Sequence, residues 1–250
     1  MFADEPMKQA WTILQAGAHD KSANKRVQAV LALGLIASDA TAIETAEHAL
    51  QDSKSEVRRA AITALGDMGS RASLPKIRAL LEHSDAKTVV AIAAVLKNFK
   101  DPQADEIYYQ ILTGERRAGG GILDGLKDKK SLERMGVEEA LGFVPFGGIG
   151  IGAYDYFKQN DSSSANVNAV AATALAQDRD PASKKALIRA SFGGKEIVQV
   201  AALRALAKCG DPSVVKDIEP AIYSKTSLIS YTAAAAVVRL SSEHSTRRLH

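Results

Sequence analysis

Apolar residues recur along this chain at helical spacing, in blocks that repeat every 31 residues. Within a block they stand at offsets of 0, 1, 3 and 4, which places them in one stripe of an α-helix. The stripes are Val30/Leu31/Leu33/Gly34, Ala61/Ile62/Ala64/Leu65, Ile92/Ala93/Val95/Leu96, Ala171/Ala172/Ala174/Leu175, Ala202/Leu203/Ala205/Leu206 and Ala233/Ala234/Ala236/Val237. Each stripe predicts the first helix of a repeat.

Five residues after each stripe stands a residue whose side chain can cap a helix. These residues are Asp39, Ser70, Asp101, Asp180, Asp211 and Ser242. Their oxygens can accept hydrogen bonds from the first N–H groups of a second helix, and proline follows three of them, where its fixed φ suits the first helical position. Mostly apolar positions seven, ten and eleven residues after the cap predict that second helix. Each unit is therefore helix–turn–helix, and stacking buries the stripes.

The two ends of the array are expected to differ from its repeats. Residues Pro6 to Gly17 predict one more helix, which covers the first repeat. Residues Ser242 to His250 either begin a last, polar second helix or form a frayed tail. Asp52 lies outside the series of caps, so it is expected to stabilise the fold less than Asp211 does.

A long insertion interrupts the period. The 79 residues from Asp101 to Asp180 make one period of 31 plus 48 extra residues. We therefore predict an all-α fold, an α-solenoid of six repeats interrupted after the third. Its segments are repeats over 1–113, an insertion rich in glycine and aromatic residues over 114–165, and repeats over 166–250, with the repeats forming one continuous solenoid.

Two segments carry a resemblance to a known family. Val57–Gly66 and Val198–Leu206 resemble the HEAT repeat family, in the short bacterial form of phycobilisome-lyase-like proteins, and the resemblance covers roughly residues 20–113 and 162–242. It implies a HEAT-like or armadillo-type solenoid whose second helices line the inner curve. It also implies a protein-binding scaffold, because most such families bind proteins. A minority bind DNA or handle bilin pigments.

The insertion and the helix before it hold the candidate partner-binding residues, because long excursions from a repeat often carry function and aromatic residues often anchor interfaces. The candidates are Tyr109, Arg116, Arg117, Phe143, Phe146, Tyr154 and Tyr156. The apolar glycine run is too short to span a bilayer, which needs roughly 20 residues. Residues Gly148–Ala153 match the dinucleotide pattern G-x-G-x-x-A but lack the strand it requires. The insertion either packs on the array or contacts a partner or a membrane surface.

Composition and candidate chemistry narrow the function further. The formal charge of +3 is too small to indicate nucleic-acid binding by itself. Cys209 is the only cysteine, which excludes an intrachain disulfide. No histidine stands at metal-ligand spacing, and no nucleophile elbow or phosphate loop occurs, so no catalytic, metal or cofactor residue is predicted. The first residues lack the features of a signal peptide, which predicts a cytoplasmic protein unless a signal was removed.

The leading functional prediction is a non-enzymatic scaffold that binds another protein. The predicted outer positions of the second helices carry charges of both signs, which fits a folded protein better than a phosphate backbone. Two alternatives stay open: a bilin-lyase-like enzyme or enzyme subunit, and a nucleic-acid-binding HEAT-like protein.

Overall fold

The computed structural model describes residues 4–113 and 163–247, and every regular element in these ranges is a helix. The α-helices are α1 (Asp4–Ala18), α2 (Ala23–Leu33), α3 (Ala40–Ala49), α4 (Ser55–Asp67), α5 (Leu74–Ala79), α6 (Ala86–Asn98), α7 (Gln103–Thr113), α11 (Ser163–Ala174), α12 (Pro181–Ala190), α13 (Glu196–Cys209), α14 (Val215–Ile218) and α15 (Ser227–Arg247). Short 3-10 helices extend some of them: η1 (Arg71–Ser73), η2 (Leu81–His83), η3 (Leu175–Gln177), η4 (Pro212–Val214) and η5 (Glu219–Tyr223). The all-α prediction is confirmed.

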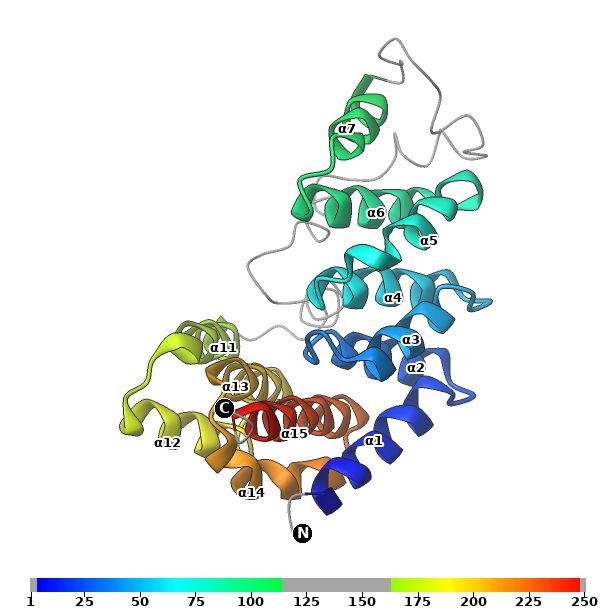
Figure 1. The fold of residues 1–250 in the computed structure, drawn as a ribbon. Helices are drawn as coiled ribbons and strands as arrows, with labels where there is room; N and C mark the ends of the chain where they lie inside the picture. Colours follow the sequence, from blue (N-terminus) through cyan, green and yellow to red (C-terminus); the bar gives the residue numbers. More distant parts are fainter. Residues whose placement is uncertain (1–3, 114–162, 248–250) are drawn as a thin grey trace.

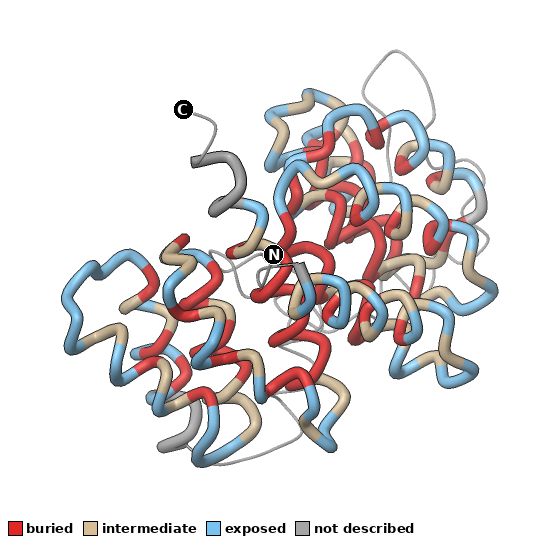
Figure 2. The backbone as a smooth tube through the Cα atoms, turned by 60° about the horizontal axis from the view of Figure 1, so that its bottom comes forward, coloured by how far each residue is buried: buried red, intermediate tan, exposed pale blue. Residues whose placement is uncertain are grey.

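The first helices stack side by side in one row, α11, α13, α15, α2, α4 and α6, each packed on the next. The second helices form a parallel row, in which α12, η5, α1, α3 and α5 each pack on the first helix that follows. Stripe residues such as Leu65, Leu96 and Leu206 are fully buried. Figure 2 shows the buried residues along the packed faces of the helices and the exposed residues largely in the turns. The predicted solenoid is confirmed, but the stripe predicted in α11 is buried only at Ala172, since Ala171 and Ala174 are exposed.

Four of the six predicted caps accept the expected backbone hydrogen bond. Asp39 accepts from the N–H of Ala42 at 2.9 Å, and Asp101, Asp180 and Asp211 accept from N–H groups two residues ahead at 3.0, 2.8 and 2.9 Å. Ser70 precedes η1, but its hydroxyl shares a 2.7 Å hydrogen bond with the hydroxyl of Ser73.

Ser242 is not a cap, and that prediction was wrong. Helix α15 runs without a break from Ser227 to Arg247, and the Ser242 hydroxyl donates to the carbonyl of Val238 at 3.0 Å. A serine that bonds the carbonyl four residues back can sit inside a helix. Unlike Asp101, Asp180 and Asp211, Ser242 is not followed by a proline that would favour a new helix start.

The order of the repeats in space differs from their order in the chain. Helix α1 lies in the row of second helices, where it packs against α15 and α2 and touches η5 and α3. The repeats at residues 86–113 and 163–190, adjacent in sequence across the insertion, therefore lie at opposite ends of the described array (Figure 1). The third and fourth repeats of the sequence are thus not neighbours in the array, which the spacing of the repeats did not indicate. The segment boundaries at 113 and 165 stay predictions.

The row of first helices lines the inside of the curve. Figure 1 shows α11, α13 and α15 inside and α12, α14 and α1 outside. Asp67, at the end of α4, interacts electrostatically with Arg204 and Lys208 of α13, although α15 and α2 stand between those helices in the row. Such a contact requires the first helices to curve toward one another. The expectation that second helices line the inner curve was therefore wrong.

Candidate interaction surface

The turns that lead from a second helix into the next first helix form one edge of the array, and we call them entry turns. Residues 19–22 and 50–54 form the entry turns of α2 and α4 in the N-terminal block, residues 4–113. Residues 191–195 and 224–226 form those of α13 and α15 in the C-terminal block, residues 163–247. Binding residues concentrate in loops, which makes the entry turns a candidate interaction surface.

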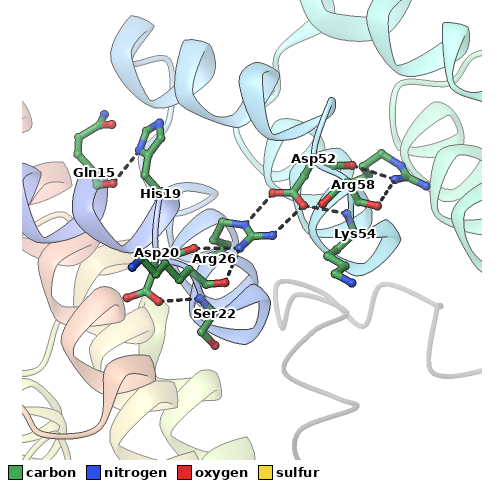
Figure 3. Close-up of polar contacts among 10 residues, drawn as sticks. Gln15, His19, Asp20, Ser22, Arg26, Asp52, Lys54 and Arg58 are labelled. Atoms are coloured by element: carbon green, nitrogen blue, oxygen red, sulfur yellow. Dashed lines mark hydrogen bonds and ion pairs between the residues drawn. The ribbon is translucent and has the colours of Figure 1, made fainter.

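The N-terminal entry turns share a polar motif built on an aspartate and an arginine (Figure 3). Asp20 accepts from the N–H of Ser22 at 2.8 Å, and Asp52 accepts from the N–H of Lys54 at the same distance. Six residues after each aspartate an arginine, Arg26 or Arg58, donates to that aspartate's carbonyl at 2.9 Å. The motif satisfies backbone groups that the turn leaves outside any helix.

The same motif joins neighbouring repeats. Arg26 donates to both carboxylate oxygens of Asp52, from Nε at 2.7 Å and from Nη2 at 2.9 Å. This bidentate bond from Arg26 is the main reason why the pKa of Asp52 lies below its usual value. At the next junction Arg59 and Asp85 approach to 3.4 Å, and Asp85 also caps α6 through the N–H of Thr88. These charges are occupied in holding the array together.

The C-terminal entry turns keep comparable backbone bonds but lack the aspartate and the arginine of the motif. Gln199 stands where Arg26 stands and donates to the carbonyl of Gly194 at 3.2 Å. Ser224 stands where Asp20 stands and accepts from the N–H of Thr226 at 3.3 Å. Among the described residues no ion pair links the entry turns of α13 and α15.

Two exposed aromatic rings occupy the edge instead. Phe192 and Tyr223 both lie twelve residues after a cap, Asp180 and Asp211, so they hold the same position in neighbouring repeats. They are 48% and 63% exposed. The equivalent residues of the N-terminal block are the polar Gln51 and Glu82, which are also exposed.

Each ring is followed closely by an exposed lysine. Lys195 comes three residues after Phe192, and Lys225 comes two residues after Tyr223. Within the described chain neither ammonium group forms an ion pair. Each of these two repeats thus presents a ring and a positive charge on the same edge.

The other exposed apolar side chains lie at the two ends of the described array. Tyr108 and Leu112 belong to α7, and Val170 belongs to α11. Both helices border the segment 114–162 in sequence, which lies outside the described residues, so their exposure does not define a surface here.

Of the seven candidate residues predicted from sequence, only Tyr109 is described. It lies in α7, half-buried, and its carbonyl accepts from the Thr113 hydroxyl at 2.9 Å. The other six, Arg116, Arg117, Phe143, Phe146, Tyr154 and Tyr156, lie outside the described residues, and their role stays a prediction. The sequence analysis missed Phe192 and Tyr223, although aligning the residues twelve after each cap would have found them.

Little in the described residues favours covalent chemistry. Cys209 is half-buried, donates to the carbonyl of Ala176 at 3.0 Å, and has a thiol pKa raised mainly by burial, which makes it a poor nucleophile. Residues 4–113 and 163–247 contain no group of three or more His, Cys, Asp or Glu side chains placed to hold a metal ion. The helices within these ranges are also too short or too polar to cross a bilayer.

Comparison with known proteins points to the repeat itself. No protein with a curated description matches this chain. A solved structure, the complex of CpcE and CpcF of phycocyanin lyase from Nostoc sp. PCC7120, contains a similar chain. The two chains share 21% sequence identity, and the match covers 98% of this chain and 94% of that chain, with a TM-score of 0.36. That score is too low to carry an argument. The family model of HEAT repeats matches residues 12–106. Residues 12–106 of this chain therefore match HEAT repeats, and the described residues form an all-helical solenoid.

Proposed function

We propose that this chain is a non-enzymatic scaffold that binds another protein along the entry turns of its C-terminal block. HEAT repeats suggest an interaction scaffold in general. The observation that carries the specific proposal is the pair of exposed rings at one repeat position, Phe192 and Tyr223. Isolated exposed apolar residues need no explanation, but two at equivalent positions of neighbouring repeats form a regular feature.

The chemistry of this edge fits a protein segment that has apolar and acidic side chains. Aromatic rings supply contact area at a small cost in side-chain entropy, and they often anchor interfaces. Lys195 and Lys225 would lie at the rim of such a contact, where charges guide association and select partners. The N-terminal entry turns also expose lysines, Lys21 and Lys54, but they have the polar Gln51 and Glu82 at the repeat position of the two rings.

The six residues predicted in the insertion form a second proposed contact of the same scaffold. Phe143, Phe146, Tyr154 and Tyr156 are aromatic residues close to glycines in the sequence. We infer that they bind the partner together with the C-terminal entry turns.

Site-specific crosslinking tests the proposal directly. A photoreactive phenylalanine analogue is placed at Phe192 or Tyr223 and, as the matched control, at the equivalent positions Gln51 or Glu82. In cells of the source organism, we expect a discrete protein adduct from the first two positions and none from the second two. Equal adducts from all four positions would contradict the assignment of the edge.

The purified protein also distinguishes this scaffold from the two alternative functions, bilin handling and nucleic-acid binding. A bilin-handling protein would show visible absorbance after purification. A nucleic-acid-binding protein would crosslink to RNA or DNA, and its binding would fall steeply with salt.

A further inference from the structure

Helices from the two ends of the sequence complete one repeat of the array. Helix α15 stacks between α13 and α2 in the row of first helices, and α1 takes the place beside it in the row of second helices. Both helices carry fully buried apolar residues, among them Ala10 and Leu14 in α1 and Ala233 and Val237 in α15. The central repeat is thus composite, built from residues more than 200 positions apart.

The packing at this repeat is close enough to demand a glycine. A Cβ atom added at Gly17 would lie 2.5 Å from Cε1 of Tyr231 in α15 and 2.8 Å from Cβ of Ala29 in α2. Both distances are shorter than a carbon–carbon contact allows, so a larger residue at this position would force the three helices apart.

Polar bonds fix the register across the same contact. The Ser227 hydroxyl donates to Oε1 of Gln28, and Nη1 of Arg239 donates to the carbonyl of Leu35 at 3.0 Å. Both bonds join α15 to the region of α2. The junction therefore combines apolar burial with directed hydrogen bonds, as a domain interior does.

The covalent connection between the two blocks is elsewhere. In sequence, residues 114–162 link α7 to α11, and these helices stand at opposite ends of the described array (Figure 1). Among the described elements, the blocks pack together through α15 and η5 against α1 and α2. The connection that joins the blocks and the surface that holds them together are thus different parts of the molecule.

We propose that the α1–α2 surface is an interaction surface whose partner is the C-terminal block itself, and that this contact holds the blocks in one particle without the covalent connection. A chain cut within 114–162 remains assembled.

The test uses the full chain with a protease recognition sequence inserted between Asp128 and Lys129. After complete cleavage, size-exclusion chromatography with light scattering measures the mass of the product. Co-elution at the mass of the uncut chain, or at twice that mass, supports the proposal, and the second result would show exchange between copies. Separate elution or precipitation of the fragments would overturn it.

Three variants show whether the contact of α1 and α2 with α15 is responsible. In the cleaved protein, Gly17→Leu should weaken association of the fragments at least about tenfold, and Ser227→Ala, a milder change, about fivefold. Gly193→Leu is the control, because its Cβ would meet only the carbonyl of Arg189 at 3.8 Å. Sedimentation over a dilution series measures the dissociation constants. Equal constants for all three variants would assign the contact to another surface and reject the proposal.

Discussion

In the N-terminal block, the aspartates of the entry turns at 19–22 and 50–54 accept hydrogen bonds from arginines of the helices that follow, and Arg26 also binds the next repeat. In the C-terminal block, the turns at 191–195 and 224–226 keep comparable backbone bonds through Gln199 and Ser224. The inter-repeat ion pair is absent from the latter turns within the described residues. Exposed rings stand beside them instead.

The difference shows that one repeat can divide its tasks along the array. A bidentate bond such as that between Arg26 and Asp52 consumes the polar groups of a turn, so little remains for a partner. Exposed lysines occur in the turns of both blocks, Lys54 in one and Lys195 in the other, but within the described array the exposed rings Phe192 and Tyr223 lie beside the C-terminal turns alone. The charges follow the same division, since residues 1–113 hold thirteen lysines and arginines against fourteen acids, whereas residues 163–250 hold twelve against seven.

The comparison of the two blocks requires that their repeats bury equivalent stripe residues. Leu206→Ala and its repeat equivalent Leu65→Ala remove fully buried side chains, so each should lower the free energy of unfolding by about 2–4 kcal/mol. Lys216→Ala, on an exposed side chain, should stay within about 0.5 kcal/mol. Urea denaturation measures all three. A loss for Leu206→Ala no larger than that for Lys216→Ala would show that the C-terminal stripe is misassigned.

The polar motif gives the next largest effect and concerns the N-terminal block alone. Asp52→Ala should cost about 1–2 kcal/mol, because Arg26 loses a charged acceptor in a largely buried position. Ser224→Ala, at an equivalent turn of the C-terminal block, should cost less than about 0.5 kcal/mol. This reverses the expectation that Asp52 matters less than Asp211. Equal denaturation midpoints for the two variants would remove the distinction between the turns.

Local features of the fold were predictable from the sequence, and the long-range order was not. The stripe that contains Leu65 and the cap at Asp39 depend on spacings within one helix, which sequence displays directly. The packing of α15 on α1 and α2 depends on contacts such as Ser227 with Gln28, which no local pattern records. Ser242 fitted the period of 31, yet it lies inside α15, where its hydroxyl donates to the carbonyl of Val238.

The candidate surface was partly within reach of the sequence. Asp20 and Asp52 are 32 residues apart, as are Arg26 and Arg58, and this second period could have indicated the polar motif. What sequence could not show is that Arg26 reaches across to Asp52, since that bond depends on the stacking of α2 on α4.

Lowering the pH should weaken a cap of the C-terminal block. The hydrogen bond from Lys184, at 2.6 Å, is the main cause that lowers the pKa of Asp211 to about 2 from 3.8. Because the folded value is the lower one, the stabilisation is present above about pH 4 and is lost as the pH falls toward 2. Asp211→Ala should cost about 1 kcal/mol at pH 6, discounted because both partners are more than a third exposed. Urea denaturation of the variant and the parent should give a smaller difference at pH 3 than at pH 6, and a constant difference would contradict the ion-pair origin.

The smallest effect on stability should accompany the largest effect on binding. Phe192→Ser with Tyr223→Ser removes two exposed rings from the C-terminal edge, so the free energy of unfolding should change by less than about 0.5 kcal/mol. Recovery of the partner that crosslinks at these positions should nevertheless be lost, because the rings are the apolar anchors of that edge.

Phe143→Ser with Phe146→Ser tests the second proposed contact in the same assay, and it should also reduce recovery more than an outer-face charge change such as Lys216→Ala. A lowered melting temperature with unchanged recovery would instead mean that the rings in question serve the fold. The two double variants lie in separate segments, so each result tests one of the two proposed contacts. Loss of binding in only one variant would identify the segment that the partner recognises.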